Sequence, residues 1–479
     1  MNYKTIAYTL GWVLKIEAVI MLLPLVCGLC YGEHQMNIIF ASCIIGIFLA
    51  GLFISFKKPQ RRTMYAKEGF VIVALSWILI SIFGAIPFWV SGYVPSFLDA
   101  VFETVSGFTT TGASVLSDVE ILPKSLIFWR SFTHWIGGMG VLVFLVAILP
   151  LSGGRNMHLI KAESPGPSVS KLVPTVRATA KILYGIYLGL TMLQCVLLLF
   201  GGMTFFEAIC TTFSTAGTGG FGIKNSSLGN FSPYCQVVVT IFMFLFSIDF
   251  SFFYLLLLGK LCSAFRLAEV RGFACIVVAS ILLVTLNCRE LFSGFFEALR
   301  HGSFQVLSVV STSGFSTTDF DLWPSFSKSI LVLLMFVGAC AGSTGGGIKV
   351  SRIIILLKSI FKEIRTAVHP RTTIKLTMNG RTIPHETVRS VNVFMASYLV
   401  IFAVSVLLIS LDNFDFTTNF TAVVATINNV GPGLAAVGPT KNFAGYSDFS
   451  KVILSLDMLI GRLEIFPMLV LFSPRTWRK

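Results

Sequence analysis

Long apolar segments separated by short polar ones dominate this chain. A helix needs about 20 apolar residues to cross the hydrocarbon core of a bilayer. Ten segments approach or exceed that length: residues 6–31, 36–56, 69–93, 126–150, 181–201, 235–259, 272–288, 328–358, 391–411 and 450–472. The pattern therefore predicts an all-α polytopic membrane protein with ten spans, in which lipid is the main surrounding partner.

Composition and charge placement agree with that prediction. Hydrophobic residues make up 55% and charged residues 12% of the chain, against about 25% charged residues in a soluble protein. Placing the N-terminus in the cytoplasm puts most Lys and Arg inside, including KKPQRR at 57–62 and the stretch 349–389. The net charge of +14 therefore sets topology rather than indicating a nucleic-acid partner, and both termini are expected in the cytoplasm.

Four outer loops are apolar, too short to span, and rich in Gly, Ser and Thr. They read FLDAVFETVSGFTTTGAS (97–114), FFEAICTTFSTAGTGGFG (205–222), VLSVVSTSGFS (306–316) and FTTNFTAVVATINNVGPG (416–433). Each combines a helical stretch, a polar tripeptide and a glycine, and these glycines are Gly112, Gly220, Gly314 and Gly431. The third loop carries an extra helical turn. The alignment predicts four helix–re-entrant loop–helix units around one central pore, plus two N-terminal transmembrane helices.

Non-helical backbone survives at membrane depth only where protein buries it or where it lines a water-filled path. Loops around one axis expose carbonyl oxygens that can replace the hydration shell of a monovalent cation. The candidate filter residues are Thr110, Thr111, Gly112, Thr218, Gly219, Gly220, Thr312, Ser313, Gly314, Asn429, Val430 and Gly431. The predicted domains are an N-terminal pair (1–67) and four pore repeats (68–155, 156–268, 269–365 and 366–479).

The stretch GSTGGGIK at 342–349 interrupts an apolar span. It is not a phosphate-binding P-loop, because Ile348 separates Gly347 from Lys349 and no strand precedes it. Counting from each filter glycine along the following helix puts this stretch, Asp249, Arg462 and the patch 138–140 at similar depth. We therefore expect residues 342–347 to cross the pore below the filter.

Arg462 is the charge that most needs an explanation, since a charged group in hydrocarbon costs about 3 kcal/mol or more. Asp457 and Glu464 lie on other faces of its helix. Its partner is expected to be either the freed carbonyls of 342–347 or Asp249, and a structural ion pair away from the pore is the alternative. The candidate gate residues are Gly342, Ser343, Thr344, Gly345, Gly346, Gly347, Arg462 and Asp249.

Several motifs together resemble the bacterial Trk/Ktr family of potassium transporters: TTTGAS, STSGFSTTDF, NNVGPG, GSTGGGIK and GRLEIFP. The two extra N-terminal spans are similar to TrkH rather than KtrB, whereas STAGTGGFG and SIDFSF depart from the family pattern. The resemblance implies a K⁺ filter, with Gly112 favouring K⁺ over Na⁺, and an intramembrane gating loop. It also implies a homodimer in the bacterial inner membrane and a cytosolic ring of TrkA-like nucleotide-binding regulatory subunits.

The leading hypothesis is K⁺ uptake by a protein that is not an enzyme and holds no cofactor besides K⁺ in its pore. A Na⁺-permeable carrier or an ion-coupled symporter is the main alternative. An intramembrane enzyme is disfavoured, because the spans contain scattered single acids and no HExxH or paired-aspartate motif. The ten cysteines include one CxxC, Cys27 to Cys30, and small apolar packing is the expected role.

Overall fold

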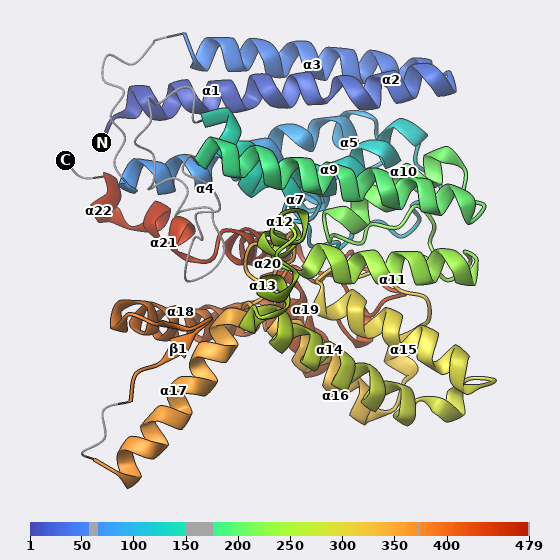
Figure 1. Cartoon of the computed structure of the whole chain (residues 1–479). Coiled ribbons are helices and arrows are strands. Elements are labelled where there is room, and N and C mark those ends of the chain that lie inside the picture. The colour runs from blue at the N-terminus through green and yellow to red at the C-terminus, as the bar shows by residue number, and fades with distance from the viewer. Residues whose placement is uncertain (57–65, 149–175, 371–373, 478–479) are drawn as a thin grey trace.

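The computed structural model describes residues 1–56, 66–148, 176–370 and 374–477 (Figure 1). Over those ranges the regular structure is helical except for a short antiparallel pair, β1 (Thr377–Met378) and β2 (Arg381–Thr382). The basic stretch 57–62 and the domain boundary predicted after residue 155 lie outside the described residues. The predicted all-α fold class is confirmed.

The N-terminal helices form a pair that lies along one side of the molecule in Figure 1. Helices α1 (Tyr3–Ile20) and α2 (Leu22–Tyr31) follow one another as one span, and α3 (His34–Ile54) returns beside them. The backbones of α1 and α3 touch, since a β-carbon at Gly11 would lie 2.6 Å from the carbonyl oxygen of Gly51. Glycine at these two positions therefore sets the spacing of the pair.

Four further units follow in the chain. The first contains α4 (Ala66–Gly84), α5 (Ile86–Val90), α6 (Phe97–Phe108) and α7 (Lys124–Ile148). The second contains α9 (Val176–Phe200), α10 (Phe205–Ala216), α11 (Pro233–Ser247), α12 (Phe250–Leu257) and α13 (Leu261–Phe265). The third contains α14 (Ala268–Asn287), α15 (Phe295–Val310), α16 (Ser325–Val337) and α17 (Val350–Val368). The fourth contains α18 (His385–Ile409), α19 (Phe416–Ile427), α20 (Asp448–Arg462), α21 (Phe466–Phe472) and α22 (Pro474–Trp477).

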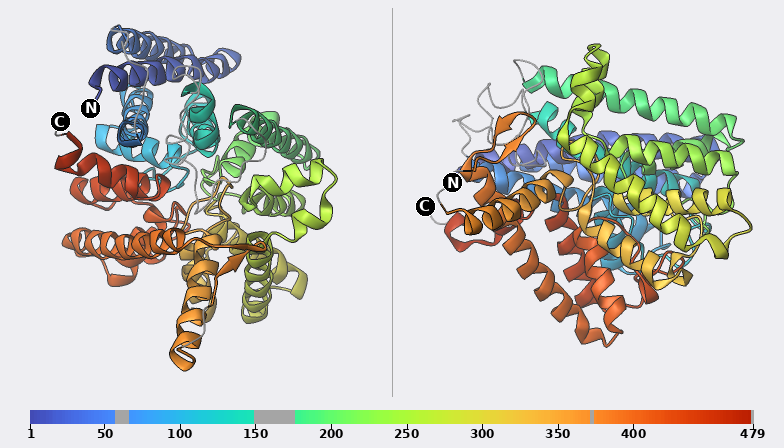
Figure 2. Two further views of the ribbon diagram at one scale, coloured as in Figure 1. Left: turned by 60° about the vertical axis from the view of Figure 1, so that its left-hand side comes forward. Right: turned by 60° about the horizontal axis from the view of Figure 1, so that its bottom comes forward.

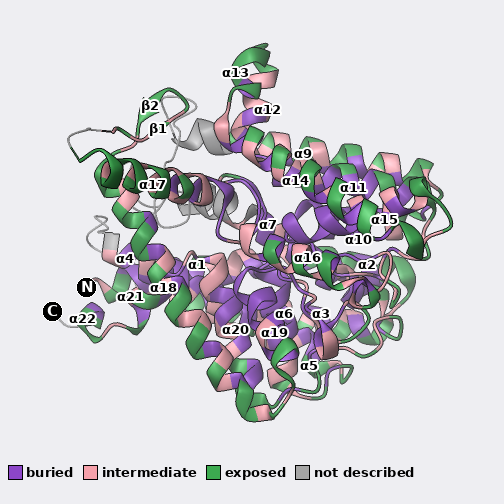
Figure 3. Cartoon of the chain, turned by 90° about the horizontal axis from the view of Figure 1, so that it is seen from below, coloured by how far each residue is buried: buried purple, intermediate pink, exposed green. Residues whose placement is uncertain are grey.

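Single 3₁₀ turns complete the described elements: η1 (Arg289–Leu291), η2 (Phe320–Leu322), η3 (Ser410–Asp412) and η4 (Ala435–Val437). The four units follow one another around a common centre, as the left view of Figure 2 shows. Buried residues gather at that centre, whereas exposed residues cover the periphery and the projecting helix α17 (Figure 3). The repeated units and the two additional N-terminal helices are those predicted.

Six continuous helices in the described ranges are long and apolar enough to cross a membrane, and the bent pair α11–α12 would make a seventh. Many of their outward side chains are also apolar: Phe53, Leu407 and Ile38 are among the exposed large hydrophobic residues. A helix that is apolar all round is typical of a lipid environment. The chain is therefore a membrane protein.

Over the described residues, the second long helix is broken in three of the four units, whereas the sequence predicted a single break. Helices α11 and α12 meet at an angle of 92°. Between α16 and α17 the chain is non-helical from Gly338 to Lys349, which starts earlier than the predicted 342–347. Helices α20 and α21 are separated at Glu464 and Ile465, whose φ angles of 56° and 70° are left-handed. The candidate spans 235–259 and 450–472 are therefore each divided into two helices.

The short helices α6, α10, α15 and α19 enter the body and end near its centre. Polar side chains cap the first amides of three of them: Ser96 for α6, Thr204 for α10 and Asp415 for α19. Helix α15 has 16 residues where the other three have 12. The extra turn predicted in the third repeat is confirmed.

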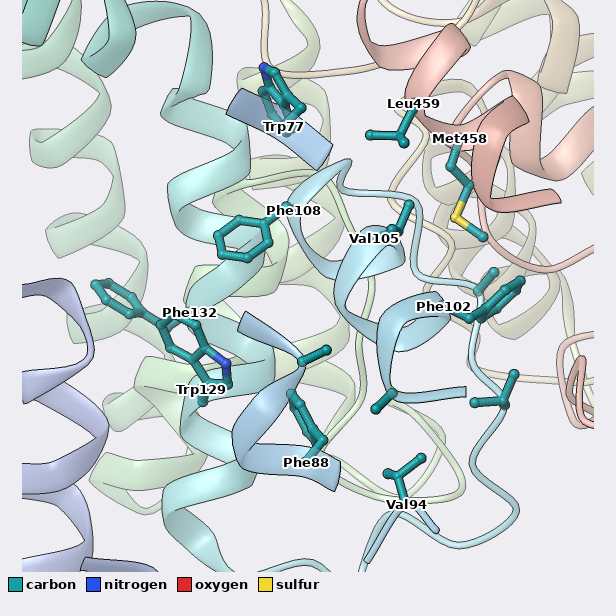
Figure 4. Packing of buried hydrophobic residues seen from close by; sticks show 14 of the residues in the cluster. Trp77, Phe88, Val94, Phe102, Val105, Phe108, Trp129, Phe132, Met458 and Leu459 are labelled. Carbon is teal, nitrogen blue, oxygen red and sulfur yellow. The ribbon is translucent and has the colours of Figure 1, made fainter. Parts of the chain in front are cut away.

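Aromatic side chains hold the first short helix in place. Phe108 of α6 packs edge-on against Trp129 of α7, with ring centroids 5.9 Å apart. The indole nitrogen of Trp129 donates to the carbonyl of Gly84 at 3.0 Å. Figure 4 shows α6 with Trp129 on one side, Met458 and Leu459 on the other, and Trp77 beyond the end that carries Phe108. The loop that follows α6 therefore starts from a rigid support.

Candidate functional site

Four identical turns follow the four short helices. In each turn a non-glycine residue adopts a left-handed conformation, and a glycine two positions later does the same. The non-glycine residues are Thr110 (φ 56°), Thr218 (55°), Thr312 (61°) and Asn429 (55°). The glycines are Gly112 (82°), Gly220 (76°), Gly314 (73°) and Gly431 (100°). Glycine is favoured at such positions because it has no β-carbon.

The residue between each pair bonds back to the helix before it. These backbone bonds run from Thr111 to Ser106, Gly219 to Ser214, Ser313 to Ser308 and Val430 to Ala425, at 2.8–2.9 Å. The same turn is thus built from four different sequences. All twelve candidate filter residues lie in these turns, in the predicted register.

The turns meet in a closed ring. A β-carbon at Gly112 would lie 1.9 Å from the carbonyl oxygen of Gly219, and one at Gly220 would lie 1.7 Å from that of Ser313. A β-carbon at Gly314 would lie 2.2 Å from Val430 O, and one at Gly431 would lie 2.6 Å from Thr111 O. The glycine of each turn thus contacts the carbonyl of the residue that precedes the glycine in the following turn. The fourth turn makes the same contact with the first, which closes the ring. No side chain fits at these contacts without moving backbone.

This ring has the chemistry of a cation site. Carbonyl oxygens from equivalent positions in four units surround one axis and offer neutral oxygen ligands. The C-terminal ends of four helices converge on it, and the partial negative charge of helix C-termini favours cations. Asn429 adds a cross-link, since its side-chain nitrogen donates to Thr111 Oγ1 and to Met458 O, both at 2.9 Å.

The break between α16 and α17 lies against the ring, where the short helices end. The amide of Gly346 donates to Thr312 Oγ1 at 2.7 Å. A β-carbon at Gly345 would lie 2.9 Å from Ser311 O, and one at Gly346 would lie 2.5 Å from Asn428 O. Gly345 and Gly346 are therefore required by the close approach of this stretch to the third and fourth turns.

The break is also joined to the bend between α11 and α12. The amides of Cys340 and Thr344 donate to the carbonyls of Ser247 and Phe246, and the amide of Phe250 donates to Gly342 O. Amides and carbonyls that lack a helical partner at one break thus form hydrogen bonds with those at the other break. This exchange explains why the second unit bends at the level of the glycine-rich stretch.

Arg462 bridges the break and the first unit. One guanidinium nitrogen donates to Thr344 O at 2.8 Å, and another donates to Gly137 O at 2.6 Å. The expected pairing with the freed carbonyls is therefore present. The contact in the first unit is made by Gly137 of α7, one residue before the predicted patch 138–140.

Asp249 lies beside the same break. One of its carboxylate oxygens would be 2.7 Å from a β-carbon at Gly342. The carboxylate caps α12 by accepting the amide of Ser251 at 2.9 Å. The residues predicted at similar depth in the four units therefore lie around one level of the structure.

Comparison with known proteins identifies the family. Residues 34–287 and 293–479 match TrkH, a family described as a cation transport protein. The chain belongs to the TrkH family. The Trk system potassium uptake protein TrkH of Salmonella typhimurium is 35% identical over 485 residues, with both chains fully covered. TrkI of Halomonas elongata is 32% identical, covering 96% of this chain and 94% of TrkI.

Comparison with solved structures supports the same family. The crystal structure of the potassium transporter TrkH from Vibrio parahaemolyticus matches with a TM-score of 0.89 and 33% identity, covering all of both chains. The predicted family and fold class are confirmed. Membership of a transport family also removes the intramembrane-enzyme alternative.

Three buried charged residues of this TrkH-family chain were not predicted at this site from the sequence. Lys349, expected in the cytoplasm, is 3% exposed, and its Nζ donates to Gly345 O. Arg352, expected there too, pairs with Glu464 at 2.5 Å. One oxygen of Glu269 accepts the amides of Ala341 at 2.6 Å and Ser351 at 3.0 Å, so it joins both ends of the break. The partners of Arg352 and Glu269 are distant in sequence, so no local pattern predicted them. Only Lys349, which lies inside the motif GSTGGGIK, could have been recognised as close to the break.

Two acids of this TrkH-family chain, on the face from which the short helices enter, remain ionised. A hydrogen bond from the Asn225 side chain, with a second from the Glu120 amide, lowers the pKa of Asp118. The hydroxyl of Thr418 does the same for the pKa of Asp415, the cap of α19. Both carboxylates lie on the side from which the short helices enter, where negative charge raises the local cation concentration.

Proposed function

We propose that this chain takes up K⁺ through one pore along the axis of the four-turn ring. The observation that supports this most strongly is the closed succession of contacts from Gly112 through Gly220, Gly314 and Gly431. Four backbone carbonyls at equivalent positions suit a dehydrated monovalent cation better than a polyvalent one. Relatives that cover the whole chain are named potassium uptake proteins.

In this proposal the twelve turn residues form the selectivity filter. The glycines let neighbouring turns touch, so the ring has a fixed circumference and a fixed distance between opposite carbonyls. An interior packed at crystalline density resists the contraction that a smaller cation would need. The filter therefore favours K⁺ over Na⁺.

We further infer that the break at 338–349 closes the pore at the inner end of the ring. Arg462 and Lys349 each donate to its carbonyls. Charge-assisted hydrogen bonds contribute about 1.5–3 kcal/mol each, and positive charge beside the axis opposes cation passage. Opening then requires these contacts to be exchanged for others, which a ligand achieves only by binding the open state more tightly.

The cytoplasmic side is proposed to bind a TrkA-like ring of nucleotide-binding subunits. Relatives are named as parts of a Trk system, and the projecting helix α17 carries the half-buried Lys362 and the exposed Arg365. The same helix also presents an exposed apolar stripe: Leu357, Ile360, Phe361, Ile364 and Val368. That stripe supports the proposed homodimer, in which each protomer would hold its own pore. We further propose, from the placement of basic residues in the sequence, that both termini are cytoplasmic and that the dimer lies in the bacterial inner membrane.

The first prediction concerns selectivity. Replacing Gly112 or Gly314 with serine should reduce the ratio of K⁺ to Na⁺ uptake in liposomes, because the side chain displaces the neighbouring carbonyl. Gly202 is the matched control: its φ is 87°, but a β-carbon there meets nothing within 4 Å. Gly202→Ser should keep the wild-type ratio. An unchanged ratio in folded Gly112→Ser and Gly314→Ser would remove the ring from the filter.

The second prediction concerns the gate. Arg462→Ala removes hydrogen bonds to Thr344 and Gly137 and a positive charge near the axis. The loss of even one charge-assisted bond of about 1.5 kcal/mol corresponds to about a tenfold shift in an equilibrium, so K⁺ uptake per folded molecule without any partner should rise at least about tenfold. Arg300→Ala, at a partly exposed arginine of α15, is the control and should leave uptake unchanged. A fall with Arg462→Ala would instead indicate a purely structural role.

The third prediction concerns the partner. Lys362→Glu together with Arg365→Glu should weaken co-purification of the nucleotide-binding subunits, because the exposed basic face of α17 becomes acidic. Lys358 is left intact, since its Nζ holds Thr377 O at 2.6 Å. Lys441→Glu, on the outer side, is the control. Normal retention and normal nucleotide regulation of the double variant would argue against docking through α17.

A further inference from the structure

A buried ion pair of the first unit lies beside the ring and contacts the second unit. Nε of Arg130 in α7 lies 2.6 Å from Oε1 of Glu103 in α6. Glu103 is 1% exposed and Arg130 is 4% exposed. Neither residue belongs to the four turns or to the break, so the pore described so far does not use them.

The remaining bonds of the pair go to the segments that follow the ring glycines. The Glu103 carboxylate accepts the Ser114 hydroxyl at 3.0 Å and the amide of Val115 at 3.1 Å. Nη1 of Arg130 donates to Gly222 O at 3.0 Å. Ser114 and Gly222 occupy the same position in their repeats, two residues after Gly112 and Gly220.

Arg130 also covers an aromatic ring of the second repeat. Its guanidinium carbon lies 3.5 Å from the centroid of Phe221, the residue directly after Gly220. Phe221 in turn stacks on His134 of α7, with centroids 4.1 Å apart. The pair therefore fixes both the first and the second residue after the glycine of the second turn.

The corresponding positions in the other repeats carry no acid. Nine residues before the ring glycine the chain has Glu103 in the first repeat, then Thr211, Gln305 and Ala422. The junction of the second and third units uses neutral bonds instead, such as Leu228 N to Ser316 O at 3.0 Å. The junction of the fourth and first units uses Phe443 N to Ser114 O at 2.9 Å. In the described residues, an ion pair with these contacts occurs at one junction of the ring.

Stability alone is a weak explanation for such a pair. Removing charges from water offsets most of their attraction, and well-packed apolar replacements are often as stable. A fork of donors in fixed geometry instead sets distances and directions between the groups that it joins. Here those groups belong to the segments that directly follow two neighbouring turns: the Ser114 hydroxyl and the Val115 amide after the first turn, and the Gly222 carbonyl after the second.

We propose that Glu103 and Arg130 are positioning residues for ion selectivity, which hold the first and second turns at the separation that K⁺ requires. The inference rests on the proposed function of the ring as a K⁺ filter. Neither side chain touches the ion. The pair acts through Ser114, Val115, Phe221 and Gly222, whose backbone directly continues the ring.

The test measures K⁺ and Na⁺ uptake by the purified full-length protein in liposomes at one fixed membrane potential, together with its melting temperature. The variants are Glu103→Gln and the double variant Glu103→Gln with Arg130→Met. The double variant leaves no unpaired buried charge and is expected to fold even if the single variant does not. Asp99→Asn is the matched control, because Asp99 on the same helix α6 pairs with Lys451 at 2.6 Å without contacting the segments after the ring.

We expect the double variant to melt near the wild type and to lose about tenfold in the ratio of K⁺ to Na⁺ uptake, or about 1.4 kcal/mol in relative barrier. Asp99→Asn should keep the wild-type ratio. A selective wild type with an equally selective double variant would overturn this inference and leave the proposed filter intact. An equal loss in Asp99→Asn would also overturn it, since general loosening would then be the cause. A wild type that passes Na⁺ as readily as K⁺ would contradict the proposed function itself, and the inference with it.

Discussion

The structure depends on satisfying irregular backbone in the middle of a membrane protein. Away from water, each unpaired amide or carbonyl costs several kcal/mol, yet this chain leaves helical geometry in four turns and at three breaks near its centre. The four turns solve the problem locally, because each bonds back to the helix that precedes it. The carbonyls at the contacts between neighbouring turns then remain available around one axis, which is what a cation site needs.

At the breaks, buried charged side chains form hydrogen bonds with the unpaired backbone groups. Basic side chains donate to carbonyls: Arg462 donates to Thr344 O and Gly137 O, and Lys349 donates to Gly345 O. An acid takes the freed amides, since Glu269 accepts from Ala341 and Ser351. The buried charged side chains are thus the hydrogen-bond partners of backbone groups that lie outside regular helix. If the break is the gate, as proposed, it can exchange these partners without unfolding.

The sequence was sufficient for features that repeat or that only one residue type allows. The register of the four turns followed from Gly112, Gly220, Gly314 and Gly431, because contact between neighbouring turns excludes every side chain. The link from Arg462 to the break followed from the absence of an acid on its own helix face. The predicted domain limits, the roles of the filter and gate residues, the partners and the orientation in the membrane stay predictions.

Other features were out of reach because hydropathy averages over a window. A polar cap such as Asp249, or a left-handed pair such as Glu464 and Ile465, ends a helix without changing the mean apolarity of the segment. The Glu103–Arg130 pair joins two helices, and its purpose depends on Phe221 and Gly222 in another repeat. Lys349 and Arg352 were expected among the basic residues of the cytoplasmic side. In the structure both side chains are buried beside the break.

The central claim is that the ring of four turns binds the permeating ion through backbone carbonyls. Crystals of the wild-type protein soaked in Rb⁺, whose anomalous scattering marks its position, test this most directly. The account predicts Rb⁺ density on the ring axis, beside the carbonyls of Thr111, Gly219, Ser313 and Val430, which K⁺ in excess should displace. Displaceable Rb⁺ density elsewhere in the protein, with none on the ring axis, would contradict it.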